Sequence, residues 1–404
     1  MANCINCYNF GNDRYFKNSM VMKRLFLLLA MVLVAVGAFA QDLPEDGVKK
    51  VKQAVYLMDN GNLDNAILLL NNVLETYPKS YNAKYELAIA YYMKEDYDTA
   101  IDICKKLQKH ENANASLYQI WGNAYDMKGE RDKAVEMYDK GLKKFPNSGQ
   151  LYLEKGNIAQ LNRDYYEALV LYEKGIEVQP DFTSNYYRAS QILAASSEPI
   201  FAILYATVYR LLDPNSERSA EMGAMIADIY KEHLVLENKG DSTLQARATL
   251  TKKNNISLSM ADLASPGALL AKMSSFELVY ERGLLDSPAL DSAIINGKIT
   301  FEDLIKIRGD AIDNYFKVRK DLAIIDSAEN ASSMPKDLVA VLLYEKKIKD
   351  AGYWRVYNAW LMGTSEFTGG YEILAKEEEK FKEFAQWEGE NLFIPSRDGL
   401  TLRQ

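Results

Sequence analysis

The stretch that decides the fold spans residues 115–148 and reads ASLYQIWGNAYDMKGERDKAVEMYDKGLKKFPNS. Bulky apolar residues recur at helical spacing on both sides of Gly129, which predicts two helices joined by a turn. Gly129 suits the end of the first helix because glycine accepts a left-handed backbone. Pro146 lacks the amide hydrogen that would continue the second helix. The segment therefore predicts one helical hairpin.

This hairpin recurs along the chain with a constant period of thirty-four positions. Five alanines follow the period: Ala66, Ala100, Ala134, Ala168 and Ala202. A second small residue stands twelve positions before each alanine, at Ala54, Ala88, Gly122, Gly156 and Ser190. A proline closes four of the repeats, at Pro78, Pro146, Pro180 and Pro214. Two helices cross closely where their facing side chains are small, so each alanine and its partner predict a helix crossing.

On these residues, the segment 47–216 resembles the tetratricopeptide repeat family, with five units at 47–80, 81–114, 115–148, 149–182 and 183–216. The third unit matches the family pattern best, through Trp121, Gly122, Tyr125, Gly129, Ala134, Tyr138 and Pro146. The resemblance implies an all-α, right-handed solenoid. The fifth unit departs most, with Ser190 as its small residue and Ala206 where an aromatic is usual. We therefore expect the fifth hairpin to be the least tightly packed.

The periodicity ends after Pro214. A further helix, from Ser219 to Leu236, is predicted to cap the solenoid, which spans 41–236. A polar stretch at 237–259 is interpreted as a linker. Residues 260–404 are predicted to form a helical C-terminal domain, with helices at 267–282, 301–325, 335–351, 353–362 and 371–388.

The resemblance also implies a binding groove, lined by the second, fifth, ninth, twelfth and thirteenth positions of each unit. The first two units supply an apolar part: Val51, Val55, Met58, Tyr85, Ile89 and Tyr92. The next three supply a part rich in carboxamides: Gln119, Asn123, Asp126, Gln150, Asn157, Gln160, Tyr187 and Gln191, with Arg188 beside them. A carboxamide both donates and accepts hydrogen bonds, so Asn123 and Asn157 suit the backbone of an extended peptide. Alternatively, the apolar part packs against the chain's own C-terminal region.

The beginning of the chain has the features of a secretory signal peptide. Lys23-Arg24 precede an apolar run from Leu25 to Val36, and Ala38-Phe39-Ala40 form a small-x-small cleavage site. Residues 1–40 are therefore predicted to be removed, and residues 1–19 are not translated if the chain starts at Met20 or Met22. The apolar run is too short to cross a bilayer, so we expect no integral membrane segment after cleavage. The mature chain is expected to be extracytoplasmic, either periplasmic or secreted.

Composition restricts the chemistry. Cleavage would remove Cys4 and Cys7, leaving Cys104, and would change the formal net charge from −8 to −11. An acidic chain argues against a nucleic-acid partner. Residues 240–404 contain neither His nor Cys, which excludes a Ser-His-Asp arrangement and an ordinary zinc site within them. His110 and His233 stand alone. We expect no catalytic residue, no metal site and no cofactor.

Three functional hypotheses follow. The first is an exported, non-catalytic scaffold whose groove holds a protein or peptide partner in a cell-envelope assembly. The second is a carboxylate-based hydrolase in the C-terminal helical domain, where Tyr353, Trp354, Tyr357 and Trp360 would line a sugar-stacking surface or lie in the core. The third is a structural subunit whose groove is filled by its own C-terminal region or, by self-association, by a second copy.

Overall fold

The computed structural model describes residues 43–238, 244–249, 276–329, 340–363 and 369–395. Over these residues the protein is all-α apart from one two-stranded sheet, as predicted. None of the helices in these ranges combines the length and the apolar character needed to span a membrane. Two compact units share the described residues. The N-terminal unit contains 43–161 and 385–391, and the C-terminal unit contains 162–384 and 392–395.

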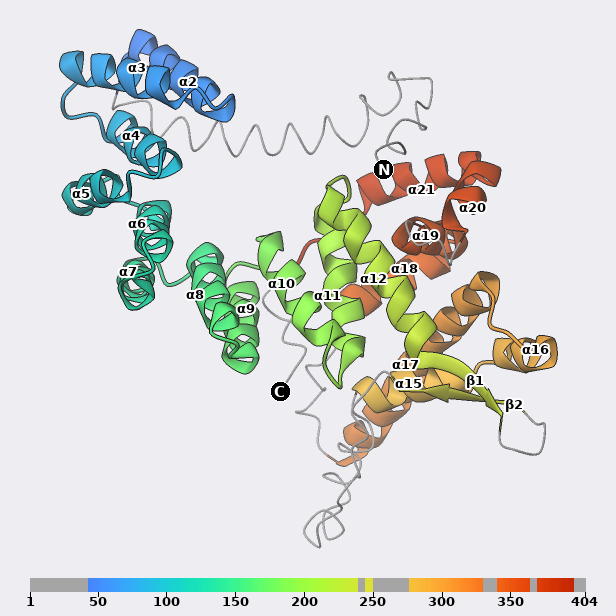
Figure 1. Cartoon of the computed structure of the whole chain (residues 1–404). Helices are drawn as coiled ribbons and strands as arrows, with labels where there is room; N and C mark the ends of the chain where they lie inside the picture. Colours follow the sequence, from blue (N-terminus) through green and yellow to red (C-terminus); the bar gives the residue numbers. More distant parts are fainter. Residues whose placement is uncertain (1–42, 239–243, 250–275, 330–339, 364–368, 396–404) are drawn as a thin grey trace, which may run out of the picture. The chain divides into compact units, whose positions relative to one another are not determined.

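The N-terminal unit is a stack of helical hairpins (Figure 1). Its helices are α2 (Glu45–Asp59), α3 (Leu63–Thr76), α4 (Tyr81–Met93), α5 (Tyr97–Leu107), α6 (Ala115–Met127), α7 (Arg131–Lys144) and α8 (Gly149–Leu161). Within each hairpin the two helices pack together, α2 on α3, α4 on α5 and α6 on α7. The first helices also contact one another, α2 with α4, α4 with α6 and α6 with α8. The first helices therefore form a continuous layer.

The predicted helix crossings of the first three hairpins are present. Ala54, Ala66, Ala88 and Ala134 are completely buried, and Ala100 is 1% exposed. A Cβ atom added at Gly122 would lie 2.1 Å from Cε1 of Tyr138 on the second helix of the same hairpin. Only glycine therefore fits at this crossing.

The turns inside the hairpins repeat as well. Gly61, Glu95, Gly129 and Arg163 occupy equivalent positions of successive repeats, and all four have a positive φ, between 64° and 78°. Glycine adopts this conformation freely, whereas a residue with a Cβ atom is strained in it. Glu95 and Arg163 adopt the same turn conformation although they are not glycine. The packing of the repeat therefore imposes the turn geometry.

The C-terminal unit begins with four helices packed in chain order (Figure 1). These are α9 (Tyr165–Val178), α10 (Thr183–Ala194), α11 (Pro199–Leu212) and α12 (Glu217–His233). The expectation of a loose fifth hairpin was wrong, because α11 is buried at every position from Pro199 to Leu211. Helices α10 and α12 contact α11, and so does α18 (Ala340–Asp350) from the C-terminal half of the chain. The contact of α11 with α18, which lies outside the repeat, therefore helps to keep the fifth hairpin packed although its sequence departs from the family pattern.

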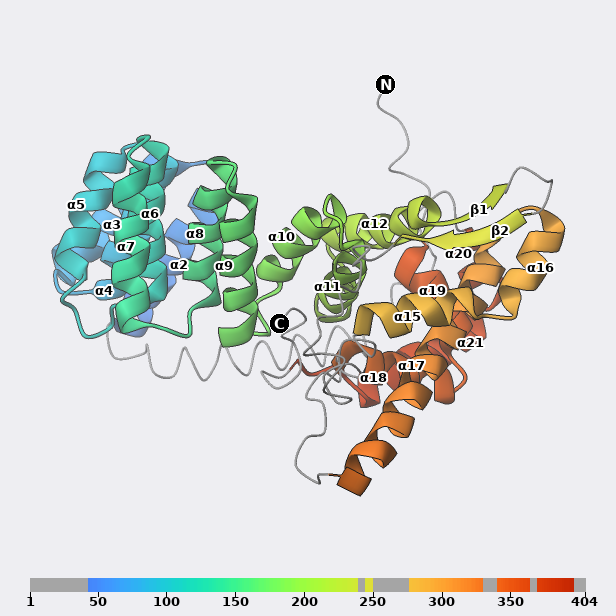
Figure 2. The same ribbon diagram turned by 90° about the horizontal axis from the view of Figure 1, so that it is seen from below.

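The predicted capping helix is α12, which packs on α11 but ends at His233 rather than at Leu236. The chain continues as β1 (Leu234–Asn238), which pairs antiparallel with β2 (Leu244–Ala248), with Leu234 opposite Ala248 (Figure 2). The linker predicted at 237–259 is therefore wrong for the residues in these strands, and residues 250–259 lie outside the described ranges. Leu234 and Ala248 are buried because β2 rests on α15 and α16.

The remaining helices are α15 (Phe276–Leu285), α16 (Ala289–Asn296), α17 (Phe301–Glu329), α18, α19 (Trp354–Met362), α20 (Gly370–Lys376) and α21 (Glu378–Glu390). Helix α16 was not predicted. The single helix predicted at 371–388 is two helices that meet at Glu377. The predicted helix starts at 267 and 335 lie outside the described residues. The predicted domain boundary at residue 236 stays a prediction, and the compact units divide at residue 161.

A buried polar network holds α17, α18 and α19 on α12. Arg308 of α17, 1% exposed, donates from Nε to the Tyr230 hydroxyl (3.0 Å) and from Nη2 to Oε1 of Glu345 (2.8 Å). Its Nη1 donates to Oδ1 of Asn358, and Tyr357 donates to Glu345 at 3.0 Å. We call these five residues the Arg308 network. It joins α12, α17, α18 and α19, so the capping helix and the C-terminal helices share one core.

Candidate functional site

A row of polar side chains runs along α4, α6 and α8 of the N-terminal unit. Gln119 donates from Nε2 to Oε1 of Glu154 (2.6 Å), and Asn157 donates from Nδ2 to Oε2 of Glu154 (3.1 Å). The amides of Gln119 and Gln150 are hydrogen-bonded to each other, and Ser116 donates to Oε1 of Gln150 (3.5 Å). Ser116 also lies close enough to the hydroxyl of Tyr85 on α4 to lower the pKa of that tyrosine. We call Tyr85, Ser116, Gln119, Gln150, Glu154 and Asn157 the inner polar row, and the surface of α4, α6 and α8 that carries it the first-helix face.

The inner polar row adjoins a tyrosine from a second helix. Tyr138 of α7 donates its hydroxyl to Oδ1 of Asn123 (2.6 Å). Burial raises the pKa of Tyr138, and the carboxylates of Glu154 and Asp126 raise it further. Burial also raises the pKa of Tyr92, with smaller effects from Tyr97 and the same two carboxylates. Both acids therefore lie in the neighbourhood of Tyr92 and Tyr138. Because the oxygen of Asn123 accepts from Tyr138, its amide is oriented with the NH2 group as the remaining donor.

Several residues of the apolar part of the predicted groove pack in or against the hydrophobic core. Met58 is 3% exposed, so it does not line an open surface. Val55 and Ile89 are half-buried and pack against the core formed by Ala54, Met58 and Leu87. Tyr85 stacks on Tyr81 with ring centroids 6.0 Å apart, and burial raises the pKa of Tyr85 to about 12.

The last predicted groove residues fall in both units. Gln160 is half-buried near the end of α8 in the N-terminal unit. Tyr187, Arg188 and Gln191 lie on α10 in the C-terminal unit, where Nη1 of Arg188 donates to Oε1 of Gln191 at 3.4 Å. The Tyr187 hydroxyl donates to Glu221 (2.7 Å), and the Arg218 guanidinium lies 4.8 Å from its ring centroid. A single groove through all five repeats stays a prediction, because its residues belong to two units.

Sequence reasoning missed Glu154, the acceptor for two amides of the inner polar row. The signal was present at the sixth position of the repeat, where Glu86 and Glu154 stand two periods apart and Arg188 follows one period later. The groove positions that the family resemblance implies do not include the sixth, although Arg188 stands beside them. Including the sixth position would have added two carboxylates to the predicted surface.

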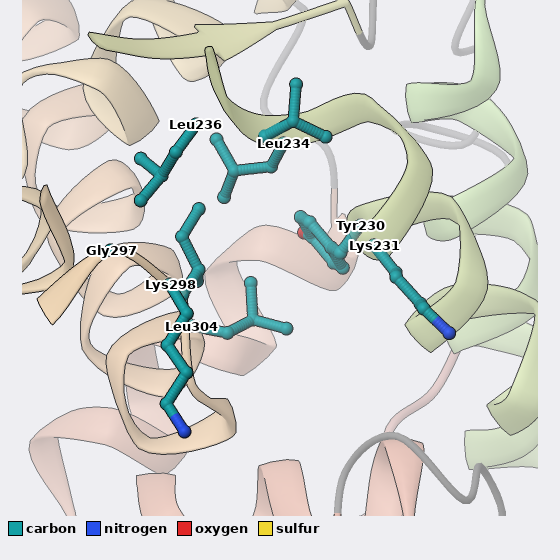
Figure 3. Close-up of a pocket in the computed structure, with 9 residues that line it drawn as sticks. Tyr230, Lys231, Leu234, Leu236, Gly297, Lys298 and Leu304 are labelled. Carbon is teal, nitrogen blue, oxygen red and sulfur yellow. The ribbon is translucent and has the colours of Figure 1, made fainter. Parts of the chain in front are cut away.

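A pocket in the C-terminal unit has a cavity volume of about 220 Å³ (Figure 3). Leu234, Leu236 and Leu304 form its apolar wall beside Tyr230. Lys231 and Lys298 supply ammonium groups, and among the described residues no carboxylate, His or Cys lines the pocket. The pocket therefore offers no general acid or base of the kind that a carboxylate-based hydrolase requires.

Two of the four aromatic residues considered for a sugar surface lie in the core, and the other two, Tyr353 and Trp360, are half-buried. Tyr357 is completely buried and Trp354 is 9% exposed, and Nε1 of Trp354 donates to the Ile305 carbonyl at 2.8 Å. Glu345, the carboxylate beside them, is 1% exposed and is paired with Arg308. Across the described ranges, no group of three or more His, Cys, Asp or Glu side chains is arranged to hold a metal ion.

Comparison with known proteins agrees with the repeat. Models of the tetratricopeptide repeat match residues 57–120, 118–148 and 149–182. The resemblance to tetratricopeptide repeats is confirmed over residues 57–182. No family model matches the C-terminal part of the chain, and no curated protein matches the chain.

Solved structures with similar hairpins include three proteins. TTC0263, a thermophilic TPR protein of Thermus thermophilus, is 16% identical, and the match covers 45% of this chain and 99% of that chain with a TM-score of 0.38. Pseudomonas aeruginosa pilF is 17% identical, with 46% and 86% covered and a TM-score of 0.39. YrrB, a TPR protein with an unusual peptide-binding site, is 18% identical, with 45% and 94% covered and a TM-score of 0.30.

Proposed function

We propose that this chain is an exported, non-catalytic scaffold that holds a protein or peptide partner on its first-helix face, within a cell-envelope assembly. The inner polar row carries the proposal. Its members Gln119, Glu154 and Asn157 are half-buried, so each reaches solvent while hydrogen bonds hold it in place. Tetratricopeptide hairpins stack into extended surfaces that bind other proteins.

The row is well suited to polypeptide recognition for two reasons. Its carboxamides supply both donors and acceptors, which a peptide backbone requires. Its side chains are already held by hydrogen bonds before a partner binds. Immobilising a flexible side chain on binding costs about 0.5–1.5 kcal/mol of binding free energy, and this cost is avoided for each side chain that is already fixed. A fixed row of amides therefore favours binding over a surface of mobile side chains.

Capture from the envelope fraction tests the binding function. The bait is the mature chain, residues 41–404, compared with the double variant Asn123→Ala plus Asn157→Ala. Asn71→Ala plus Asn72→Ala is the matched control, because these asparagines are exposed on the second helix α3. We expect the groove variant to lose a partner that wild type and control retain. If the groove variant folds and retains every partner, the first-helix face is not the binding surface. Recovery of only further copies of the chain would favour self-association instead.

Export has its own test. The support is the charged segment at Lys23-Arg24, the apolar run after it and the site ending at Ala40. We expect the mass of the exported protein to correspond to a chain that begins at Gln41, and Ala38→Glu plus Ala40→Glu to accumulate the uncleaved form. A wild-type chain that stays uncleaved in the cytoplasm would contradict export.

A further inference from the structure

An exposed apolar row accompanies the inner polar row on the first-helix face. The last residues of α4, α6 and α8 are Met93, Met127 and Leu161, which occupy the same position of three successive repeats. They are 43%, 56% and 56% exposed, although large apolar residues normally withdraw from water. The three helices contact one another in order, so the three side chains occupy equivalent ends of adjacent helices. Neighbouring helices lie about 8–10 Å apart, so the row spans about 16–20 Å.

The same face carries a carboxylate that pairs with no cation in the described part of the chain. Glu154 accepts hydrogen bonds from Gln119 and Asn157, and no Lys or Arg among the described residues forms an ion pair with it. Asp126, in the neighbourhood of the same tyrosines, is paired only with Arg131 within the described part of the chain, at 3.4 Å between Nε and Oδ1.

Two lysines of the N-terminal unit pair with carboxylates other than Glu154. Lys155, its neighbour in sequence, pairs with Asp139 of α7 at 2.7 Å. Lys128 pairs with Asp98 at 2.5 Å and with Glu130 at 3.3 Å. The first-helix face therefore offers negative charge beside an apolar row, and a complementary occupant brings the opposite charge together with apolar side chains.

We propose that the first-helix face takes an extended segment of a partner protein, with apolar side chains at every third position and a Lys or Arg that pairs with Glu154. This rests on the proposed function and specifies its occupant. Three residues of an extended or polyproline II segment advance about 9–10 Å, which equals the spacing of the helices. In a polyproline II segment, residues three apart also lie on the same side. Each apolar side chain then meets one residue of the row.

A peptide library tests the occupant directly. The probes are capped heptapeptides with Leu at positions one, four and seven and mixed residues elsewhere, incubated with the full mature chain. We expect Lys and Arg to be enriched in the bound fraction. Enrichment of Asp or Glu, or no selection at all, would overturn the proposal.

Variants then assign the contacts. Glu154→Gln removes the charge, while its single amide oxygen still accepts a hydrogen bond from one of Gln119 and Asn157, so it should weaken the best basic heptapeptide about tenfold, the scale of one charged contact. Glu136→Gln, an exposed acid on the second helix α7, is the matched control. Met127→Gln should also weaken binding, whereas Leu68→Gln, on a residue 59% exposed on α3, should not. Equal binding by Glu154→Gln and wild type would contradict the charge pairing.

Capture from the envelope fraction distinguishes the proposed basic occupant from the proposed scaffold function. A partner that is lost from Asn123→Ala plus Asn157→Ala but bound equally by wild type and Glu154→Gln would leave the scaffold in place and overturn the basic occupant. A partner retained by all variants would overturn both.

Discussion

Replacing Arg308 by Met should strongly destabilise the C-terminal unit. The guanidinium is 1% exposed and bonds Tyr230, Asn358 and Glu345, so its loss leaves the Glu345 carboxylate buried without a cation. Removing one partner of a buried ion pair costs about 3–5 kcal/mol. Met fills the space of the Arg side chain up to the position of Nε without its charge, which limits the cavity. The hydroxyl of Tyr357 still donates to Glu345 and offsets a minor part of the cost.

A double-mutant cycle separates the ion pair from packing. Glu345→Gln preserves hydrogen bonding to Arg308 and Tyr357 but leaves the guanidinium without a counter-charge, so it should also cost several kcal/mol. The double variant should cost less than the sum of the single changes, with a coupling energy of about 2 kcal/mol or more, since residues in one network couple by about 0.5–3 kcal/mol.

Urea unfolding of the mature chain measures these effects. Trp354 reports the region, because its ring lies 5.3 Å from the Arg308 guanidinium, and far-UV circular dichroism follows the helices. Arg355→Met is the matched control, because Arg355 is 40% exposed and pairs with Glu302 at 45% exposure, where we expect at most about 1 kcal/mol. Single changes at Arg308 and Glu345 that cost less than the control, or that add without coupling, would refute the assignment of this network to the core.

Three further predictions concern the N-terminal unit. Glu95→Gly should raise the free energy of unfolding by about 1 kcal/mol, since it relieves a φ of 66°, and Gly129→Ala should lower it by a similar amount; equal melting temperatures would show that the turns carry no strain. Gly122→Ala should lower stability by about 1–3 kcal/mol because its Cβ would overlap the Tyr138 ring, and an unchanged melt would contradict that packing. Burial raises the pKa of Cys104 to about 12, so its thiol should stay protonated and unreactive toward a disulfide reagent at pH 8 until urea unfolds the chain; rapid labelling of the native protein would disprove its burial.

Much of the candidate site could be predicted from the repeat, but its chemistry could not. The period placed Gln119, Asn123 and Asn157 on the first helices, where the structure has them. It did not show that Asn123 accepts from Tyr138 or that Glu154 holds two amides, because those contacts depend on how the side chains are turned. A period states which positions are equivalent. Which side chains meet depends on rotamers and on the spacing of the helices.

The β-hairpin shows a signal that sequence reasoning overlooked. In β2, Gln245 and Arg247 are more exposed than Ala246 and Ala248, which is the two-residue alternation of a half-buried strand. The polar composition of the segment concealed this pattern. Arg247 pairs with Glu237 of β1 at 2.6 Å, a contact that stabilises the strand pair at its exposed side.

The sequence by itself determined the helical hairpins and their crossings, since a regular period of small side chains permits close packing at those points alone. Local chemistry suffices there, because each hairpin contacts its neighbours in the chain. Only the tertiary structure decided how α11 is covered and why Arg308 is buried. Tyr230, Arg308 and Glu345 are separated by 78 and 37 residues, and a buried charge is stable only when folding brings its partners together.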